Sequence, residues 1–182
     1  MLLYRLNAMM RLRSMTTGYG IAQMQSMTTL SHNGWTASID PTAIGIGSYP
    51  VPGTKIKLRC AAAVAPLLVT FAAEFHQHIE PIDQGALDDW GYCYRNIRGS
   101  TDKLSNHSSG TAIDLNATKH PLGHAATFTP MQTVLIQALC KKYGLKWGGD
   151  YHRKDEMHFE VSLNPAKCAE LIGKLMKNWQ IQ

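Results

Sequence analysis

The chain has 182 residues, of which 45% are hydrophobic and 17% charged, and its formal net charge is +5. This length and composition fit one globular domain and exclude a collagen-like or wholly disordered chain. The positive charge favours anionic partners such as nucleic acid, anionic lipid or a bacterial wall polymer, but no run of Lys and Arg is dense enough to choose among them.

Residues 1–33 are rich in Met, Thr, Ser and Gln and show no sustained hydrophobic period. We therefore expect a poorly ordered leader over residues 1–33 and one folded domain over residues 34–182. The leader has no apolar stretch long enough for a signal peptide, because Arg11 and Arg13 interrupt it. The most apolar run further along, residues 60–73, is too short to span a bilayer. The sequence predicts a soluble protein without a signal peptide.

The first half of the domain is predicted to contain loops, two strands and one helix. Gly and Pro residues over 34–53 indicate loops with at most short strands. Residues 54–58 alternate polar and apolar side chains, as a half-buried strand does. Residues 61–79 have helical spacing, and Pro66 is expected to open or kink this helix. Residues 90–97 are predicted to be a strand. The helix stripe that faces the core comprises Leu67, Leu68, Phe71, Phe75 and His78.

Two later helices have clear start signals. Thr129 is a good N-cap, Pro130 is a good first helical residue, and Gln132 completes a capping box. Gly144 is expected to end this helix in the left-handed conformation, and Asn164 to start the second helix in the same way as Thr129. The predicted buried stripes are Val134, Leu135, Ala138 and Leu139 in the first helix and Cys168, Leu171, Ile172 and Leu175 in the second.

Between these helices lies a short segment that alternates strictly and therefore predicts a strand. Met157, Phe159 and Val161 are expected to face the core, whereas His158 and Glu160 point into a cleft. Helices that flank a few short, non-adjacent strands indicate an α+β fold.

The four cysteines, Cys60, Cys93, Cys140 and Cys168, are widely scattered and include no C-x-x-C pair. This spacing suggests neither a disulfide framework nor a cysteine zinc site. We expect reduced cysteines, with Cys140 and Cys168 buried in their helices as small hydrophobic side chains.

Two separate segments together supply a set of metal ligands. His107 and Asp114 are seven residues apart, so a turn must bring them together, and the small and polar residues 108–110 are turn formers. His158 would arrive from a separate strand, with Glu160 placed to hold its ring. Three nitrogen and oxygen ligands, with a fourth position left for water, are typical of a catalytic zinc site.

A spare carboxylate stands close to the last histidine. Asp155 lies three residues before His158 and could take a proton from zinc-bound water and deliver it to the leaving amine. Glu156 is the rival, because strand alternation places it on the same face as His158 if the strand is regular that far. The residues alone leave both assignments open. The remaining buried or surface histidines are expected to have no metal role; they are His76, His78, His120, His124 and His152.

The pattern Ser-x-His-x-x-Gly-x-Ala-x-Asp-Leu at residues 105–115, followed by Asp-x-x-His-x-Glu at residues 155–160, resembles the zinc D-Ala-D-Ala carboxypeptidase and L-Ala–D-Glu endopeptidase family. This is the VanY-type peptidase fold, which is shared with many phage endolysins. The flanking segments at residues 92–95, 115–117 and 147–150 look most like the endolysin branch. The similarity covers roughly residues 34–175.

The resemblance implies a small antiparallel sheet flanked by helices, as in hedgehog-type and D,D-peptidase domains, with zinc in a cleft on the sheet. His107, Asp114 and His158 would be the zinc ligands. The family carries its catalytic acid/base three residues before the last histidine, which implies Asp155 for that role here.

The resemblance also assigns residues to the substrate. The family has an arginine upstream of the first motif that holds the substrate or the developing oxyanion. Arg95 matches it best, and Arg98 is the second choice. Ser105 would line the cleft.

Together these observations predict a zinc-dependent L-Ala–D-Glu endopeptidase that acts on peptidoglycan stem peptides in the manner of an endolysin. It would be a monomer that stays in the cytoplasm until release to the wall, with no nucleic-acid partner and no membrane insertion. The alternatives are a D-alanyl-D-alanine carboxypeptidase and a non-catalytic, zinc-stabilised wall-binding or signalling module. A basic nucleic-acid binder is a further possibility, but the sequence has no basic and aromatic stripe for it.

Overall fold

The computed structural model describes residues 29–179, and these form an α+β domain, as predicted. The described helices are α1 (Ala65–His78), α2 (Pro130–Tyr143) and α3 (Pro165–Trp179). The short 3-10 helices are η1 (Thr42–Ile44), η2 (Asn106–Ser109) and η3 (Gly148–Asp150). The strands are β1 (Thr29–Leu30), β2 (Thr36–Ala37), β3 (Ile46–Pro50), β4 (Lys57–Ala61), β5 (Ala112–Asp114), β6 (Leu145–Trp147) and β7 (His158–Val161).

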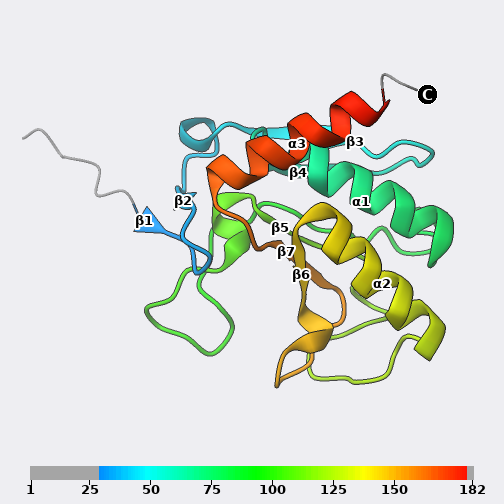
Figure 1. The fold of residues 1–182 in the computed structure, drawn as a ribbon. Helices are drawn as coiled ribbons and strands as arrows, with labels where there is room; N and C mark the ends of the chain where they lie inside the picture. Colours follow the sequence, from blue (N-terminus) through cyan, green and yellow to red (C-terminus); the bar gives the residue numbers. More distant parts are fainter. Residues whose placement is uncertain (1–28, 180–182) are drawn as a thin grey trace, which may run out of the picture.

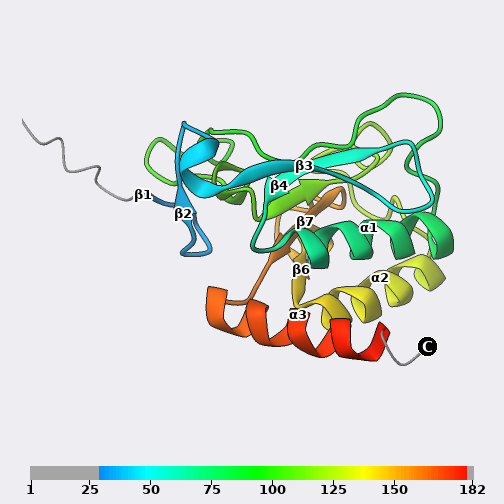
Figure 2. The same cartoon turned by 90° about the horizontal axis from the view of Figure 1, so that it is seen from above.

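The strands form small antiparallel sheets rather than one large sheet. β1 pairs with β2, β3 pairs with β4, and a three-stranded sheet has the order β5-β7-β6. Figure 2 shows the hairpin of β3 and β4 along one side of the domain and the helices toward the other, with β6 and β7 between the hairpin and α3; in Figure 1 the hairpin lies behind α3. The resemblance implied one small antiparallel sheet flanked by helices; the described residues form an α+β domain with three separate small antiparallel sheets.

The central strand β7 connects the core with the polar face of the sheet. His158 lies directly opposite Asp114 on β5, and Glu160 lies opposite Ala112. Because side chains alternate along a strand, Phe159 points the other way. Its ring packs against Phe71 and Phe75 of α1, with centroid distances of 4.8 and 5.6 Å.

Helix α1 forms much as the sequence predicted. It begins at Ala65, with Pro66 in its first turn, and buries the predicted stripe of Leu67, Leu68, Phe71 and Phe75 completely. The exception is His78, which is exposed. His78 is the last residue of the helix, so its side chain extends beyond the sheet that the stripe covers.

Helix α2 has the predicted cap but a different buried face. Thr129 and Gln132 form the capping box, and Gly144 ends the helix at φ 65°. The predicted inward residues Val134, Leu135 and Ala138 are exposed, and Leu139 is half-buried. The buried residues are Ile136, Cys140 and Tyr143, which are also spaced at helical intervals.

Tyr143 explains this rotation of α2. Its ring packs edge-on against Phe71, and its hydroxyl donates to Glu74 of α1 over 2.6 Å. A large aromatic ring whose hydroxyl reaches a partner outweighs the smaller apolar area of Val134 and Ala138.

The predicted strand over residues 90–97 is wrong. Only isolated bridges form there, between Trp90 and Asp114 and between Asn96 and Leu104. The backbone of this segment pairs in turn with three different elements, because Trp90 bonds to β5, Tyr92 to Arg59 on β4, and the next residue to the carbonyl of His107 in η2. A segment whose hydrogen bonds are shared in this way cannot form a continuous ladder.

Helix α3 and the cysteines follow the predictions. Cys168 is buried, and the other predicted stripe residues of α3, Leu171, Ile172 and Leu175, pack half-buried against the core. All four cysteines are free; Cys93 is exposed and the others are buried. No helix among the described residues is both long and apolar enough to cross a bilayer.

Most of the predicted leader, residues 1–28, lies outside the described residues. The last residues of that predicted leader lie against the rest of the domain. Ser31 is buried and donates to the Ser109 hydroxyl over 2.8 Å. The Asn33 side chain donates to the Thr111 hydroxyl and to the Val161 carbonyl. The domain boundary at residue 33 remains a prediction.

Candidate metal centre

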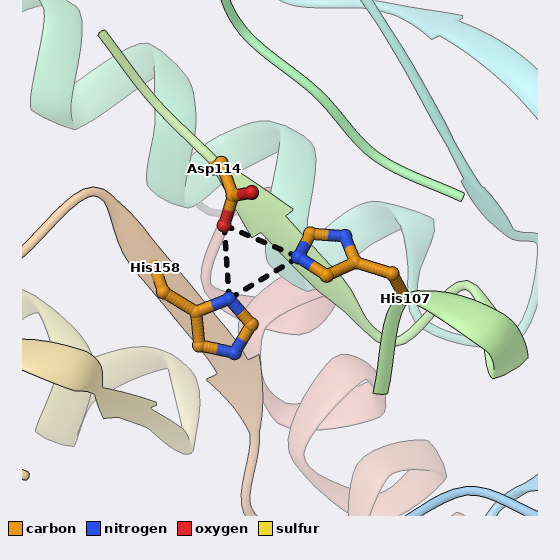
Figure 3. Close-up of side chains that lie close together, drawn as sticks. All are labelled: His107, Asp114 and His158. Atoms are coloured by element: carbon orange, nitrogen blue, oxygen red, sulfur yellow. Dashed lines mark hydrogen bonds and ion pairs between the residues drawn. The ribbon is translucent and has the colours of Figure 1, made fainter. Parts of the chain in front are cut away.

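His107, Asp114 and His158 converge on one point, as Figure 3 shows. One carboxylate oxygen of Asp114, Oδ1, lies 3.1 Å from His107 Nε2 and 2.9 Å from His158 Nδ1, and the two ring nitrogens are 3.2 Å apart. All three side chains are buried. A tetrahedral zinc ion at about 2.0–2.1 Å from such ligands separates them by roughly 3.3 Å. The spacing of the three atoms therefore fits one small divalent ion.

The turn that joins the first two ligands depends on Gly110. η2 is capped by Ser105, whose hydroxyl accepts from the His107 amide, and it ends at Gly110 with φ 66°. A Cβ on Gly110 would lie 2.3 Å from the Ile46 side chain and 2.7 Å from the Ala61 nitrogen. The left-handed backbone and the tight contact both require glycine. This is the turn that the sequence required between His107 and Asp114.

The outer ring nitrogens of both histidines have acceptors. His107 Nδ1 lies 2.7 Å from the Gly91 carbonyl oxygen, and His158 Nε2 lies 3.1 Å from Glu160 Oε2. If each of these nitrogens donates its hydrogen outward, the nitrogens that face Asp114 carry free lone pairs. Metal-binding histidines are commonly held in this way by a carbonyl or carboxylate. The donor set thus fits a metal ion in tautomer as well as in spacing.

Gly91 and Asn106 support this arrangement from behind. A Cβ on Gly91 would lie 2.1 Å from the Arg59 carbonyl oxygen, so only glycine lets this segment pack against β4 and present its carbonyl to His107. The Asn106 side chain donates to Glu160 Oε2 over 2.5 Å and accepts from the Asn33 amide. The sequence analysis missed both residues, because a backbone acceptor and a bridging amide have no sequence signal of their own.

The cluster is strongly coupled electrostatically. Burial raises the pKa of Asp114, but the charges and hydrogen bonds of His107 and His158 outweigh it, so the net shift is downward. Burial lowers the pKa of His158, yet the hydrogen bonds that its ring donates to Asp114 and Glu160 raise it overall. Without a metal, the two carboxylates beside His158 therefore favour its protonated form. A divalent ion replaces that proton when it binds, because ligand histidines must be neutral.

Asp155 stands beside the cluster with an unsatisfied carboxylate. Its Oδ1 is buried and has no hydrogen-bond partner. Burial raises its pKa, and the charge of Asp114 adds to the shift, against the opposing effect of His158. The backbone turn that places it is tight, because a Cβ on Gly148 would lie 2.3 Å from the Asp155 carbonyl oxygen. A buried carboxylate with a raised pKa next to candidate ligands suits proton transfer.

Glu156, the rival for that role, is directed elsewhere. Its carboxylate accepts hydrogen bonds from the backbone amides of Ala126 and Thr127, both over 2.8 Å, and from the Thr127 hydroxyl. It does not line the cavity at the cluster. The strand is not regular as far as Glu156, because β7 begins only at His158 and a turn precedes it. Met157 is buried, as predicted, but it also lines the cavity and lies outside the main hydrophobic cluster.

A cavity of about 350 Å³ opens on the cluster, and we call it the β7 cavity. Its lining combines cationic and apolar side chains. Ser105 and Tyr151 contribute hydroxyls, and Glu160 contributes a carboxylate whose pKa is lowered by the hydrogen bonds of His158, Asn106 and Tyr151 despite its burial. Its cations are Arg95, Arg98, Lys146 and Arg153, and its apolar lining is Ile97, Leu122 and Met157.

Arg95 and Arg98 are both placed near the cluster. Both line the β7 cavity. The guanidinium of Arg95 donates only to the Asn96 carbonyl, over 3.4 Å, and is otherwise available to a ligand. The charge of Arg98 contributes to lowering the pKa of Asp155, so it lies within electrostatic reach of that carboxylate. The geometry therefore offers either arginine to a substrate carbonyl.

A second cavity of about 340 Å³ is also lined by His107 and Asp114, and we call it the β4 cavity. Arg95 and Arg98 line both cavities, as do these two ligands. The candidate metal centre thus borders both cavities. The other residues around the β4 cavity are Lys57, Arg59, Asp89, Trp90, Gly91, Tyr92 and Cys93.

His120 is also buried, but it lies outside the cluster and has hydrogen-bond partners of its own. His120 is 2% exposed, and its ring nitrogens contact Thr127 and Glu80 at 2.7 Å each. Its ring stacks on Phe128 with a centroid distance of 3.7 Å. It is a satisfied core histidine, in line with the prediction that it has no metal role.

Comparison with known proteins adds one match. Residues 98–161 match a family model described as D-alanyl-D-alanine carboxypeptidase, and this segment contains all three candidate ligands and Asp155. The match covers about a third of the chain and supports the predicted peptidase family. No curated protein and no solved structure gave a significant match.

Proposed function

We propose that this protein is a zinc-dependent peptidase that hydrolyses an amide bond in peptidoglycan stem peptides. One observation carries the proposal. Two imidazole nitrogens and a carboxylate oxygen meet at ligand spacing beside Asp155, one of whose carboxylate oxygens is buried and has no hydrogen-bond partner. The family match over the same residues supports a metallopeptidase of the carboxypeptidase kind.

The protein's own groups can perform the proton transfers of amide hydrolysis. A bound zinc ion would supply Lewis acidity, which polarises a carbonyl and acidifies water. Asp155 takes a proton at its carboxylate from the attacking water and returns it to the leaving nitrogen. Its raised pKa suits both halves of that exchange. Arg95, or Arg98 in its place, holds the carbonyl oxygen as negative charge develops on it.

The two cavities favour an endopeptidase over a carboxypeptidase. A carboxypeptidase needs space for only one residue beyond the scissile bond, whereas an endopeptidase must accept chain on both sides. Both the β7 and the β4 cavity reach the cluster, since His107 and Asp114 line each of them, and the two together offer more room than one terminal residue needs. We therefore keep L-Ala–D-Glu endopeptidase as the proposed specificity, with D-alanyl-D-alanine carboxypeptidase as the alternative. The endolysin-like role, the cytoplasmic location before release and the monomeric state remain predictions.

A non-catalytic zinc-stabilised module is the main alternative of another class. Such a module needs the three ligands but has no use for a buried carboxylate without a partner, which costs free energy. The unsatisfied Asp155 oxygen is therefore the observation that separates the two. A nucleic-acid binder would instead bind DNA with an affinity that falls steeply with salt.

The test is substitution of Asp155 in the zinc-loaded protein. Asp155→Asn should lower hydrolysis of defined muropeptides by about 10²–10⁴-fold while zinc content stays near one ion per chain. Asp150→Asn is the matched control, because Asp150 is exposed and bonds only to Gln137. Mass spectrometry of the products identifies the bond, since free D-alanine indicates a carboxypeptidase. Unchanged hydrolysis in Asp155→Asn would exclude Asp155 as the acid/base.

A further inference from the structure

The β4 cavity has a cationic wall that the proposed chemistry does not use. Lys57 and Arg59 alternate with buried residues on β4, so both point to the outer face of the hairpin. Both line the β4 cavity, which Arg95 and Arg98 line as well. Four cations thus surround one space next to His107 and Asp114.

These cations have no acidic partners within the described chain. None of the four forms an ion pair with a carboxylate of residues 29–179. The one acid in the cavity besides the ligand Asp114 is Asp89, whose carboxylate accepts from the Asn116 amide and keeps its other oxygen buried. Asp89 therefore does not neutralise Lys57 or Arg59. Unpaired cations that converge on a cavity favour an anionic ligand.

Arg59 is held in place before any ligand binds. Its guanidinium lies over the Tyr92 ring, 5.0 Å from the centroid. The Tyr92 hydroxyl in turn donates to the Ser38 carbonyl over 2.7 Å, and the Arg59 carbonyl accepts from the Tyr92 amide. A guanidinium stacked on a fixed aromatic ring loses less entropy when it binds a carboxylate.

We propose that the β4 cavity is a carboxylate subsite in which Lys57 and Arg59 bind the α-carboxylate on the carbon that carries the scissile nitrogen. This inference rests on the proposed peptidase function and specifies its substrate. In an L-Ala–γ-D-Glu stem the chain continues through the γ-carboxyl, so the α-carboxylate of D-Glu is free at that position. In a peptide that ends in D-Ala-D-Ala, the terminal carboxylate occupies the same position.

The shared carboxylate explains why the cavity directly adjoins the ligands. A group one carbon from the scissile nitrogen lies within one residue of the cluster, and the β4 cavity begins at His107 and Asp114 themselves. Arginine recognises carboxylates in a planar, two-pronged fashion, and lysine adds a second positive charge. An amide in place of the carboxylate would lose the charge and one acceptor oxygen.

The test is a binding titration with paired peptides. The zinc-loaded full chain carrying Asp155→Asn is titrated calorimetrically with L-Ala–γ-D-Glu–L-Lys and with the same peptide in which the α-carboxylate is an amide. The acid should bind at least about tenfold more tightly than the amide. Adding Lys57→Gln and Arg59→Gln together should reduce this ratio to near one. Adding Lys55→Gln is the matched control, because Lys55 is exposed on the same hairpin and lines neither cavity.

A second pair of peptides distinguishes the two sources of the carboxylate. A peptide ending in D-Ala-D-Ala is compared with its C-terminal amide under the same conditions. Discrimination in the first pair assigns the subsite to an internal D-Glu, and discrimination in the second pair alone assigns it to a chain end. Both results support the carboxylate subsite.

The experiments can contradict the carboxylate subsite and the peptidase function independently of each other. Equal binding of acid and amide in both pairs, or no binding of either acid, overturns the subsite even if the wild-type protein hydrolyses muropeptides. Discrimination that persists after the double Lys57 and Arg59 substitution overturns it as well. If the wild-type protein cleaves no muropeptide but the acid preference depends on Lys57 and Arg59, the subsite stands and the peptidase function falls. Melting curves of each variant show that the exposed substitutions leave the fold intact.

Discussion

The two sides of the candidate metal centre are built in different ways. On one side, η2, β5 and β7 deliver the three ligands through short segments whose pattern is visible in the sequence. On the other side, residues 89–98 lie against β4 with almost no regular structure, and their place depends on contacts with distant residues. The ligands of the first side can therefore be recognised in short segments of the sequence, whereas the position of the second side depends on long-range contacts in the folded domain.

Removing one of the three ligands should abolish metal binding on the first side. His158→Ala should lower zinc content to near zero and hydrolysis on the order of 10³-fold or more, because two ligands hold the ion poorly and Asp155 loses its neighbour. Chelation of the wild-type protein should lower its melting temperature for the same reason. Zinc analysis and turnover are measured together. His152→Ala is the control, since His152 is exposed; zinc retained by His158→Ala would contradict the assignment.

A substitution on the second side should weaken the metal site indirectly. Gly91→Ala would press a Cβ against the Arg59 carbonyl and move the Gly91 carbonyl away from His107. We expect zinc affinity to fall about 10–100-fold and the free energy of unfolding to fall by about 1–3 kcal/mol. Competition with a chelating dye and denaturant titration give the two values. Gly173→Ala on α3 has open space and should cause neither loss. Equal zinc affinity in Gly91→Ala and wild type would show that the two sides are independent.

Zinc affinity should also depend on pH through His158. The pKa of this group is raised in the folded, metal-free protein, so the stability it contributes is complete below the unfolded pKa of about 6.5 and is lost as pH rises through its folded pKa. At neutral pH zinc must displace that proton, and affinity should rise up to about tenfold for each pH unit over this window. Dye competition between about pH 6 and pH 8 measures the slope. A flat profile would mean that His158 is already neutral before zinc binds.

Glu156→Gln should have the smallest effect. Glu156 anchors the loop at Ala126 and Thr127 and does not face the cavity. The pKa of this carboxyl is lowered, with the hydrogen bonds of Thr127 and Ala126 outweighing the effect of burial, so its charge helps to hold the loop. We expect a loss of about 1–2 kcal/mol in unfolding free energy and turnover within about twofold of wild type. A loss as large as that of Asp155→Asn would return the acid/base role to Glu156.

The difference between locally determined and long-range features also explains which parts of the structure the sequence could predict. The ligand spacing, the turn at Gly110, the cap of α2 and the core face of Phe159 depend on neighbours within a few residues, and the structure agrees with them. To choose between Asp155 and Glu156, one must know at which residue β7 begins, and strand alternation alone does not give that position.

Other features could not be predicted because they depend on partners far along the chain. The buried face of α2 is set by Tyr143 against α1, and residues 90–97 are divided among three elements. The bridge from Asn33 through Asn106 to Glu160 joins segments more than 50 residues apart. Amides that act as connectors carry no periodic pattern, so only the folded arrangement reveals them.

That bridge has a practical consequence for shortening the protein. The Asn33 amide donates to Asn106, whose side chain donates to Glu160, which in turn contacts the outer nitrogen of His158. A truncated form that starts at residue 34 would cut the first link of this relay and leave the Asn106 oxygen without its donor. Trimming for crystallisation or expression should therefore stop ahead of Thr29, so that the chain of hydrogen bonds to His158 is kept whole.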